Sequence, residues 1–106
     1  MKPLALRPQA RQDRRSEVRH YRDVAGAQVA TKLVDALQEA LLQIQRQPGI
    51  GSPPLGQALA VAGLQTRLVD GFPRVFGYFE RETLVGVARL VGQRQDALGI
   101  EIDTGQ

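Results

Sequence analysis

The side chains able to do acid–base chemistry are few in this chain. His20 is the single histidine, cysteine is absent, and no tyrosine or histidine follows Tyr78. Lysine occurs only at Lys2 and Lys32. These counts exclude disulfides, thiol catalysis, thiolate metal sites and multi-histidine metal clusters. Tyr78 would act as a general base only if its pKa were strongly lowered, and His20 lies in a charged segment typical of a solvated surface.

Arginines are the residues best suited to bind a phosphate or a carboxylate. Arg67, Arg74, Arg89 and Arg94 lie in the second half of the chain, where they could stabilise a phosphate. Arginine stays protonated, however, and is a poor proton shuttle. Two interpretations of Arg89, Arg94 and Asp96 stay open: an arginine–aspartate pair that fixes the end of a strand, or a polar patch that a partner recognises.

Other chemical motifs are missing. The chain contains neither the G-x-x-x-x-G-K phosphate loop nor the G-x-G-x-x-G dinucleotide fingerprint. Glu80 and Glu82 are paired in spacing, but they fall at an expected hairpin tip, where carboxylates are usually solvated. We therefore expect no catalytic residue, cofactor or metal site from the residues themselves.

Composition indicates a small globular protein with a basic N-terminal end. The chain has 106 residues, of which 42% are hydrophobic and 24% charged, and its net charge is +3. Twelve of the fourteen basic residues are arginine, and residues 1–25 hold seven basic residues against three acidic ones. This excess favours an acidic partner, either protein or nucleic acid. No apolar run is long enough for a signal peptide or a membrane span, so we expect a cytoplasmic protein without membrane contact.

The first half of the chain predicts one strand and two helices. Residues 2–7 alternate and predict a short strand, and Pro8 suits the first turn of a polar helix that runs to about residue 22. After Gly26, apolar residues at spacings of three and four predict a helix over residues 27–47, which Pro48 ends. Two helices joined at a glycine predict an antiparallel hairpin.

The second half predicts strands. Residues 48–63 begin as a loop, and period-two patterns then predict strands over 64–69, 74–79 and 83–91. The third of these is the most apolar and is expected to be central. The order is β-α-α-β-β-β, an α+β fold with the helical hairpin on one face of a small antiparallel sheet. The first strand must pair with the later ones to avoid standing alone.

Four of the five aromatic residues, Phe72, Phe76, Tyr78 and Phe79, fall within eight positions. Strand alternation places Phe76 and Tyr78 on one face, which we expect under the helices. It places Phe79 on the other face with Val75, and parity adds Arg67 from the neighbouring strand. We expect this second face to be open to a partner.

Several short motifs, taken in order, resemble toxins of the ParE/RelE superfamily of type II toxin–antitoxin systems. The helix break at Pro48 and Gly51 resembles the family's P-x-x-G. Phe72-Pro73 with the aromatic strand after it resembles the family's F-P motif. The remaining matches are Gly63-Leu64 with Arg67, Val87-Ala88-Arg89-Leu90, and Gly92-Gln93-Arg94 with Asp96. Gln65 and Val91 depart from the residues usual in the family.

The resemblance implies one toxin domain over residues 1–98, followed by a tail, 99–106, with a short extra strand as the alternative. RelE-like members cut mRNA on the ribosome with basic residues and a late tyrosine or histidine, whereas ParE-like members are understood to poison DNA gyrase. Because this chain lacks the late tyrosine and histidine, the ParE-like branch is favoured and a RelE-like endoribonuclease is the alternative. Gln65 and Val91 leave open whether toxicity is retained.

The resemblance also implies partners. A cognate ParD-like antitoxin with an acidic tail is expected to wrap the domain, DNA gyrase is the expected target, and nucleic acid is expected to be bound only through the antitoxin complex. The candidate partner-binding residues are Arg14, Arg15, Arg67, Val75, Phe79, Arg89, Arg94 and Asp96.

Overall fold

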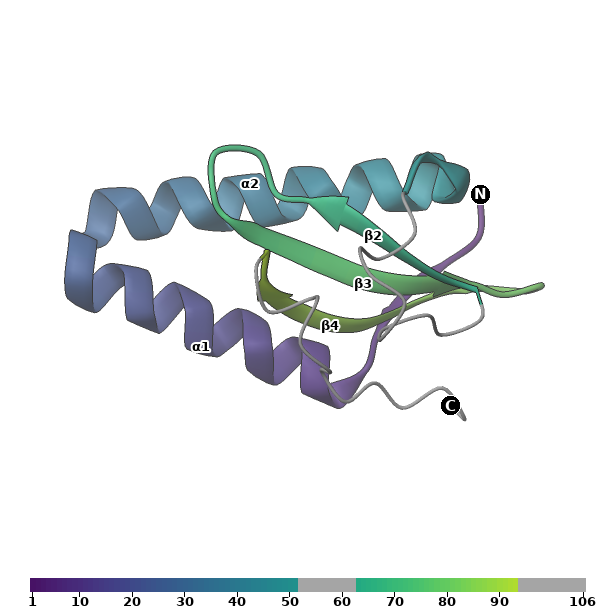
Figure 1. Ribbon diagram of the computed structural model, residues 1–106, viewed down its shortest axis with the longest axis horizontal. Coiled ribbons are helices and arrows are strands. Elements are labelled where there is room, and N and C mark those ends of the chain that lie inside the picture. Colours follow the sequence, from purple (N-terminus) through teal and green to yellow (C-terminus); the bar gives the residue numbers. More distant parts are fainter. Residues whose placement is uncertain (52–62, 94–106) are drawn as a thin grey trace.

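A computed structural model describes residues 1–51 and 63–93. Within these two ranges the elements are β1 (Leu4–Leu6), α1 (Pro8–Ala25), α2 (Ala27–Arg46), the 3-10 turn η1 (Pro48–Ile50), β2 (Leu64–Leu68), β3 (Arg74–Glu80) and β4 (Val85–Gly92). The two helices form one layer and the four strands the other (Figure 1). The predicted α+β fold and its β-α-α-β-β-β order are confirmed, with boundaries that differ from the expected ones by up to three residues.

Two prolines and one glycine shape the helical hairpin. Pro8 occupies the first turn of α1, where its missing N–H leaves no hydrogen bond unmade. Gly26 joins the helices with φ +96°, a backbone conformation that favours glycine, and its N–H closes α1 on the Arg22 carbonyl. Pro48 then opens η1, so α2 ends where proline predicts.

The sheet has the strand order β1-β4-β3-β2. β2, β3 and β4 pair antiparallel, as expected, and β4 lies in the interior of the sheet, also as expected. β1 adds to β4 in parallel, with Ala5 opposite Gly86, so the sheet is mixed. The first strand therefore pairs with a later one, as expected, and both helices lie between the two strands in the sequence.

An irregularity in β4 decides which side chains enter the core. The register between β3 and β4 shifts between Gly77 and Tyr78, which leaves Ala88 as an extra residue on β4. Strict alternation after Val87 would place Arg89 on the helix face. Because of the shift, Leu90 is buried in the core, while Arg89 stays partly exposed.

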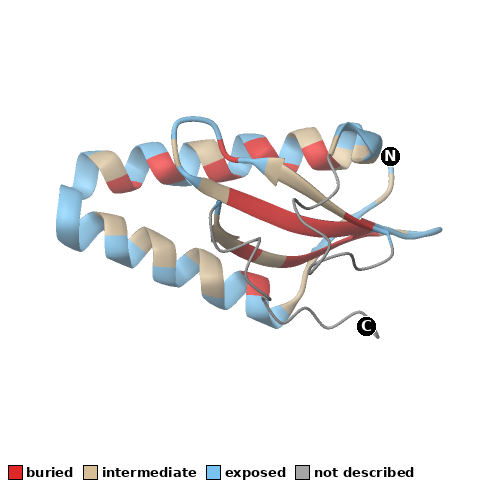
Figure 2. Cartoon of the chain, viewed as in Figure 1, coloured by how far each residue is buried: buried red, intermediate tan, exposed pale blue. Residues whose placement is uncertain are grey.

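The main core lies between the helices and the sheet. One face of α2 supplies Leu33, Leu37, Ala40, Leu41 and Ile44, and β3 supplies Phe76 and Tyr78. β3 is buried along almost its whole length, whereas α2 alternates between buried and exposed residues (Figure 2). The apolar stripe of α2 and the shared face of Phe76 and Tyr78 are thus confirmed as core.

Some expectations fall on residues that the structure does not describe. The tail 99–106, its alternative strand, and the site candidates Arg94 and Asp96 all lie outside residues 1–51 and 63–93. Over those described ranges, no helix is long and apolar enough to cross a membrane.

Candidate partner-binding surfaces

A groove runs between the two helices, and we call it the hairpin groove. α1 contributes Arg14, Arg15, Val18, Arg19 and Arg22, and α2 contributes Val34, Leu37 and Gln38. The groove encloses about 500 Å³. Its arginines share one side of α1 because Arg15, Arg19 and Arg22 are spaced by four and three residues. The structure thus brings the predicted Arg14 and Arg15 together at one surface and adds two arginines that sequence reasoning missed.

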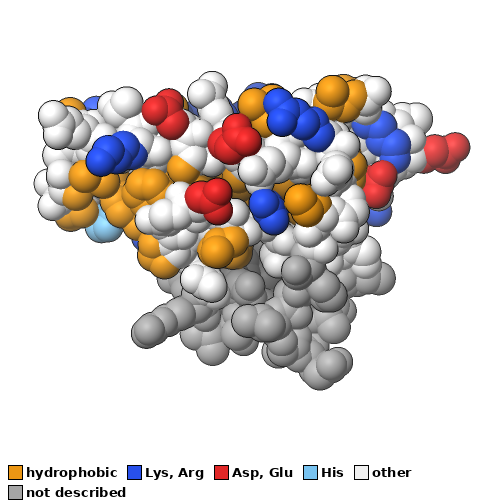
Figure 3. Space-filling model, turned by 90° about the horizontal axis from the view of Figure 1, so that it is seen from above, with side chains coloured by type: hydrophobic (Ala, Val, Ile, Leu, Met, Phe, Trp, Pro, Cys, Tyr) orange, Lys and Arg blue, Asp and Glu red, His pale blue; other side chains and the backbone are white. Residues whose placement is uncertain are grey.

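The hairpin groove combines positive charge with exposed apolar surface. No carboxylate is found among its described lining residues. Val34 is 38% exposed and lies beside these arginines. Outside the groove, on the outer side of the molecule at α2, hydrophobic side chains are interspersed with charged ones of both signs (Figure 3). The composition of the groove suits an amphipathic segment that carries carboxylates along one edge.

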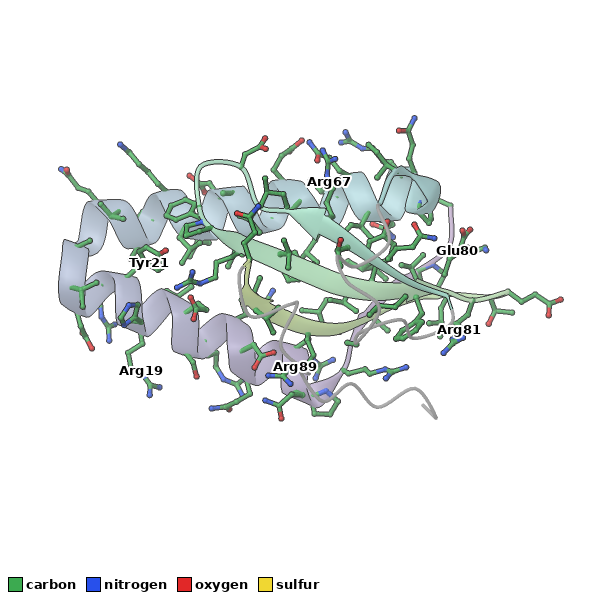
Figure 4. All side chains as sticks on the ribbon, viewed as in Figure 1. Arg19, Tyr21, Arg67, Glu80, Arg81 and Arg89 are labelled. Atoms are coloured by element: carbon green, nitrogen blue, oxygen red, sulfur yellow. The ribbon has the colours of Figure 1, made fainter. Side chains whose placement is uncertain are left out.

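Arg67 lies on the other side of the sheet from the one predicted. Antiparallel pairing sets Arg67 opposite Phe76, whose side chain faces the helices, so Arg67 shares that face. Its Nε and Nη2 donate hydrogen bonds to Gln43 Oε1 of α2 at 3.1 and 2.6 Å. Figure 4 shows Arg67 beside α2. The expectation that Arg67 joins Val75 and Phe79 on an open face is therefore wrong.

Val75 and Phe79 do lie on the face away from the helices, but neither is open. Val75 is 6% exposed and Phe79 is 1% exposed, so the predicted exposure is wrong. Phe79 packs with Leu64 and Ala88 in a second small cluster. The guanidinium carbons of Arg7 and Arg81 lie 5.5 and 4.7 Å from its ring centroid. The two guanidinium groups lie over the Phe79 ring, which strand alternation had predicted to be exposed.

Arg89 is held by α1. Its Nε and Nη2 donate to the two carboxylate oxygens of Asp13 at 2.7 and 3.4 Å, and the Leu90 N–H donates to the same carboxylate at 3.0 Å. Arg89 thus forms an arginine–aspartate pair with Asp13 of α1, a partner that was not predicted, while the predicted partner Asp96 lies outside the described residues. Asp13 lies 76 positions away in the chain, so the sequence around Arg89 could not predict this pairing. Arg74 makes a comparable ion pair with Glu17 of the same helix.

Tyr78 is buried and bonded to the turn that follows α2. Its hydroxyl donates to the Pro48 carbonyl at 2.6 Å, and Gln65 Oε1 lies 3.2 Å from the Tyr78 hydroxyl oxygen. Burial raises the pKa of Tyr78 above its ordinary value, against smaller lowering effects from the Gly51 backbone and Arg67. A tyrosine that acts as a general base would need a lowered pKa. Gln65, the departure from the family pattern, thus lies beside this hydroxyl.

The remaining candidates for acid–base chemistry, His20 and Lys2, lie on different segments, on α1 and before β1 respectively. His20 is exposed on α1, with its ring edge-on to Tyr21 at 5.6 Å. Lys2 binds Glu80 at 3.0 Å at the opposite end of the fold. Over residues 1–51 and 63–93, no group of three or more His, Cys, Asp or Glu residues could hold a metal ion.

Comparison with known proteins places this arrangement in a family. The arrangement is a helical hairpin on a small mixed sheet, with arginines at its surfaces. Residues 4–97 match the family described as the ParE toxin of the type II toxin–antitoxin system parDE. The chain belongs to this ParE toxin family, and a ParD-type antitoxin is the partner that membership implies.

A solved structure agrees in fold. The chain resembles one from a structure described as the chromosomal ParDE toxin–antitoxin system from P. aeruginosa, with a TM-score of 0.74 and 21% sequence identity. The match covers 87% of this chain and 96% of that one. No curated protein matched the sequence.

Proposed function

We propose that this ParE-family toxin arrests growth in the cytoplasm by binding DNA gyrase without cleaving nucleic acid. The alternative, a RelE-like endoribonuclease, requires a general acid and a general base beside the scissile phosphate. Arginines can stabilise the phosphate in either case, so the presence or absence of the proton shuttles is what distinguishes the two functions.

The observation that carries this proposal is that Tyr78 is buried and hydrogen-bonded to Pro48. It is the last tyrosine in the chain, and no histidine follows it. Its hydroxyl donates to Pro48 from a buried position, and burial raises its pKa, so it is poorly suited to accept a proton at neutral pH. Lys2 is paired with Glu80, and His20 is exposed on α1, with its ring against Tyr21. A toxin that acts by binding needs none of these groups to shuttle protons.

Neutralisation by the antitoxin is assigned to the hairpin groove. Arg14, Arg15, Arg19 and Arg22 would meet the carboxylates of an acidic antitoxin tail, and Val18 and Val34 would meet its apolar anchors. Arg14 and Arg15 at the rim steer association more than they add affinity, because exposed ion pairs are screened by water and salt. Nucleic acid would then be contacted only through the antitoxin complex.

The test is expression without antitoxin, followed by assays for both candidate targets. We expect growth arrest, induction of the DNA-damage response and intact bulk mRNA, together with inhibition of supercoiling when purified toxin is added to gyrase. Rapid cleavage of translated mRNA at codon positions would overturn the proposal and establish the endoribonuclease instead. Growth arrest with neither effect would point to a third target, and an absence of arrest would show that the departures at Gln65 and Val91 accompany lost toxicity.

A further inference from the structure

The exposed side of α1 carries a row of arginines. Two carboxylates in the middle of this helix turn toward the sheet, where Asp13 binds Arg89 and Glu17 binds Arg74. On the opposite side of the helix, exposed arginines spaced by four and three residues form what we call the basic row: Arg15, Arg19 and Arg22. Asp23 lies 3.8 Å from the last of these. Over residues 1–51 and 63–93, the other two form no ion pair.

The exposed side of α2 carries the opposite charge. Two carboxylates and a leucine, also spaced by four and three residues, form what we call the acidic row: Asp35, Glu39 and Leu42. This row lies on the other side of the helix from the core residues Leu37 and Ile44. In the described part of the chain neither carboxylate forms an ion pair, and Glu39 accepts a 3.3 Å hydrogen bond from Gln43. The cations of α2, Lys32 and Arg46, come before and after the row in sequence.

Apolar side chains lie between the two rows. Val18 of α1 is half-buried, Val34 of α2 is 38% exposed, and both line the hairpin groove. Leu42 adds an apolar side chain that is 43% exposed. The outer surface of the hairpin therefore has an apolar centre with a basic rim along α1 and an acidic rim along α2. Helices that pack together in pairs commonly show this division into an apolar seam and charged flanks.

Such a surface is complementary to itself under one two-fold rotation. If a second copy is turned about an axis parallel to the groove, α1 of each copy lies on α2 of the other, and the facing helices run antiparallel. The basic row of each copy then meets the acidic row of the other, so every charge pair is made twice. A two-fold axis across the groove would instead place α1 on α1, and repulsion between the arginines disfavours it.

The levels of the charges along the hairpin match the first arrangement. The helices meet at Gly26 and run antiparallel (Figure 1), so residues equally far before and after Gly26 lie at about the same level. The groove lining agrees, because Arg15 and Leu37 are both 11 positions from Gly26 and both line it. Rotation about an axis parallel to the groove leaves these levels unchanged, so they also compare one copy with the other.

Each carboxylate of the acidic row falls between two arginines of the facing helix. Asp35 is 9 positions from Gly26, whereas Arg19 and Arg15 are 7 and 11 positions from it. Glu39, at 13 positions, falls between Arg15 and Arg11, which are 11 and 15 positions away. A helix rises about 1.5 Å per residue, so each carboxylate is offset along the axis by only about 3 Å from an arginine on either side. Arginine side chains are long enough to close such an offset.

We infer that the free toxin forms a two-fold dimer through the outer surface of its helical hairpin, with each copy covering the hairpin groove of the other. The exposed charge pairs make this dimer weak and sensitive to salt. The antitoxin is assigned to the same groove, so its acidic tail replaces the acidic row of the second copy. The dimer itself is independent of the proposed function, and only this competition with the antitoxin rests on it.

Sedimentation of the purified full-length toxin over a range of concentrations measures the dimer. High salt is expected to raise the dissociation constant of the wild-type dimer by about tenfold or more. Arg15→Glu/Arg19→Glu turns the basic row acidic, and Asp35→Lys/Glu39→Lys turns the acidic row basic. Each variant alone is expected to weaken the dimer by about a hundredfold, because like charges then face each other. An equal mixture of the two should restore dimerisation to within about tenfold of wild type, since each row again meets its opposite.

The matched control is Asp70→Lys/Glu82→Lys, which makes the same change of charge at two exposed positions outside the helices and should dimerise like the wild type. Melting temperatures check that each variant is folded. If a double variant does not fold, Arg19→Gln and Asp35→Asn replace the reversals, and each should weaken the dimer by about threefold or more. A wild type that stays monomeric at low salt would overturn the inference. So would variants that dimerise as tightly as the wild type, or a mixture of folded variants that stays monomeric.

The competition is tested separately by stopped-flow binding of the ParD-type antitoxin. Wild-type toxin above its dimer dissociation constant should bind the antitoxin more slowly per molecule than dilute toxin, because the groove must first be uncovered. Asp35→Lys/Glu39→Lys, which stays monomeric, should show no such dependence on concentration. If the wild type dimerises but its antitoxin binding shows no such slowing, the shared use of the groove is wrong. That result would count against the antitoxin site assigned above, whereas sedimentation alone decides the dimer.

Discussion

The Tyr78 hydroxyl donates a 2.6 Å hydrogen bond to the carbonyl of Pro48, which ties the middle of β3 to the turn after α2. Both residues belong to motifs that identify the family by sequence, yet they lie 30 positions apart. The bond joins Pro48, which follows the end of α2, to Tyr78 in the core. Tyr78 thus acts as a tether between the two layers.

Replacing Tyr78 by phenylalanine should destabilise the protein and change its response to alkaline pH. The loss of the hydroxyl leaves the Pro48 carbonyl without this donor, so we expect a cost of about 1–3 kcal/mol in the free energy of unfolding. The folded state raises the pKa of Tyr78 and retains the proton that the unfolded state releases near pH 10. This contribution to stability is therefore fully present below that pH and is lost as pH rises above it.

The measurement is chemical unfolding of the wild type and Tyr78→Phe from neutral to alkaline pH. The stability gap between them should narrow above pH 10. Tyr21→Phe is the control, because Tyr21 is only half-buried. A gap that widens with pH would contradict the raised pKa. The Tyr78→Phe variant should still arrest growth once lower temperature restores its folding. If Tyr78 were a catalytic residue, the substitution would abolish growth arrest.

The contact between Gly51 and Tyr78 gives a sharp steric prediction. A Cβ at Gly51 would overlap the Tyr78 hydroxyl and lie 2.9 Å from Tyr78 Cζ and 3.0 Å from Gln65 Cβ. Gly51→Ala should therefore displace the tether and destabilise the fold by about 1–3 kcal/mol. Gly49→Ala is a matched control, because nothing lies within 4 Å of its added Cβ. Equal melting temperatures for the two variants would show that the turn moves freely away from Tyr78.

The buried face of α2 should dominate the stability of the hairpin. Leu37 is 1% exposed in the core, so Leu37→Ala is expected to cost about 2–5 kcal/mol. Leu42 is 43% exposed on the same helix, and Leu42→Ala is expected to change stability by less than about 1 kcal/mol. Unfolding curves in urea check both values. Comparable losses for the two leucines would mean that the outer face of α2 is also packed.

Asp13 should matter more than its place on a polar helix suggests. Its carboxylate accepts hydrogen bonds from Arg89 and from the Leu90 N–H, and its side chain is 11% exposed. Asp13→Ala is expected to cost about 1.5–3 kcal/mol, because a charged partner is left half-buried. Asp23→Ala should cost almost nothing, since its pair with Arg22 is 3.8 Å long and exposed. Thermal melts that rank the two substitutions in the reverse order would contradict this account.

Association with the antitoxin should depend on the charge of the hairpin groove. The double substitution Arg14→Glu/Arg15→Glu is expected to slow association by about tenfold at low salt, and high salt should shrink the difference. Stopped-flow titration of the ParD-type antitoxin at two salt concentrations measures both effects, with Arg46→Glu as the control. An association rate that responds to neither salt nor the double substitution would leave recognition to the apolar residues of the groove.

The sequence by itself determined the elements and their order. Proline and glycine ended the helices at Pro48 and Gly26 because both residues act on the local backbone. The apolar stripe of α2 and the alternation that paired Phe76 with Tyr78 were readable because a helix or strand imposes its period on neighbouring residues. Arg15, Arg19 and Arg22 share one side of α1 for the same reason, since residues three and four positions apart lie next to one another on a helix.

The tertiary structure alone decided which distant residues meet. The β1–β4 pairing is parallel because of the path the chain takes around the hairpin, and the extra residue at Ala88 moves Arg89 out of the core, where strict alternation would have placed it. Asp13 and Gln43 become partners of Arg89 and Arg67 through packing between layers. Phe79 is covered by arginines from two separate loops. None of these contacts leaves a local trace, because the free energy that selects them comes from burying surface between segments far apart in the chain.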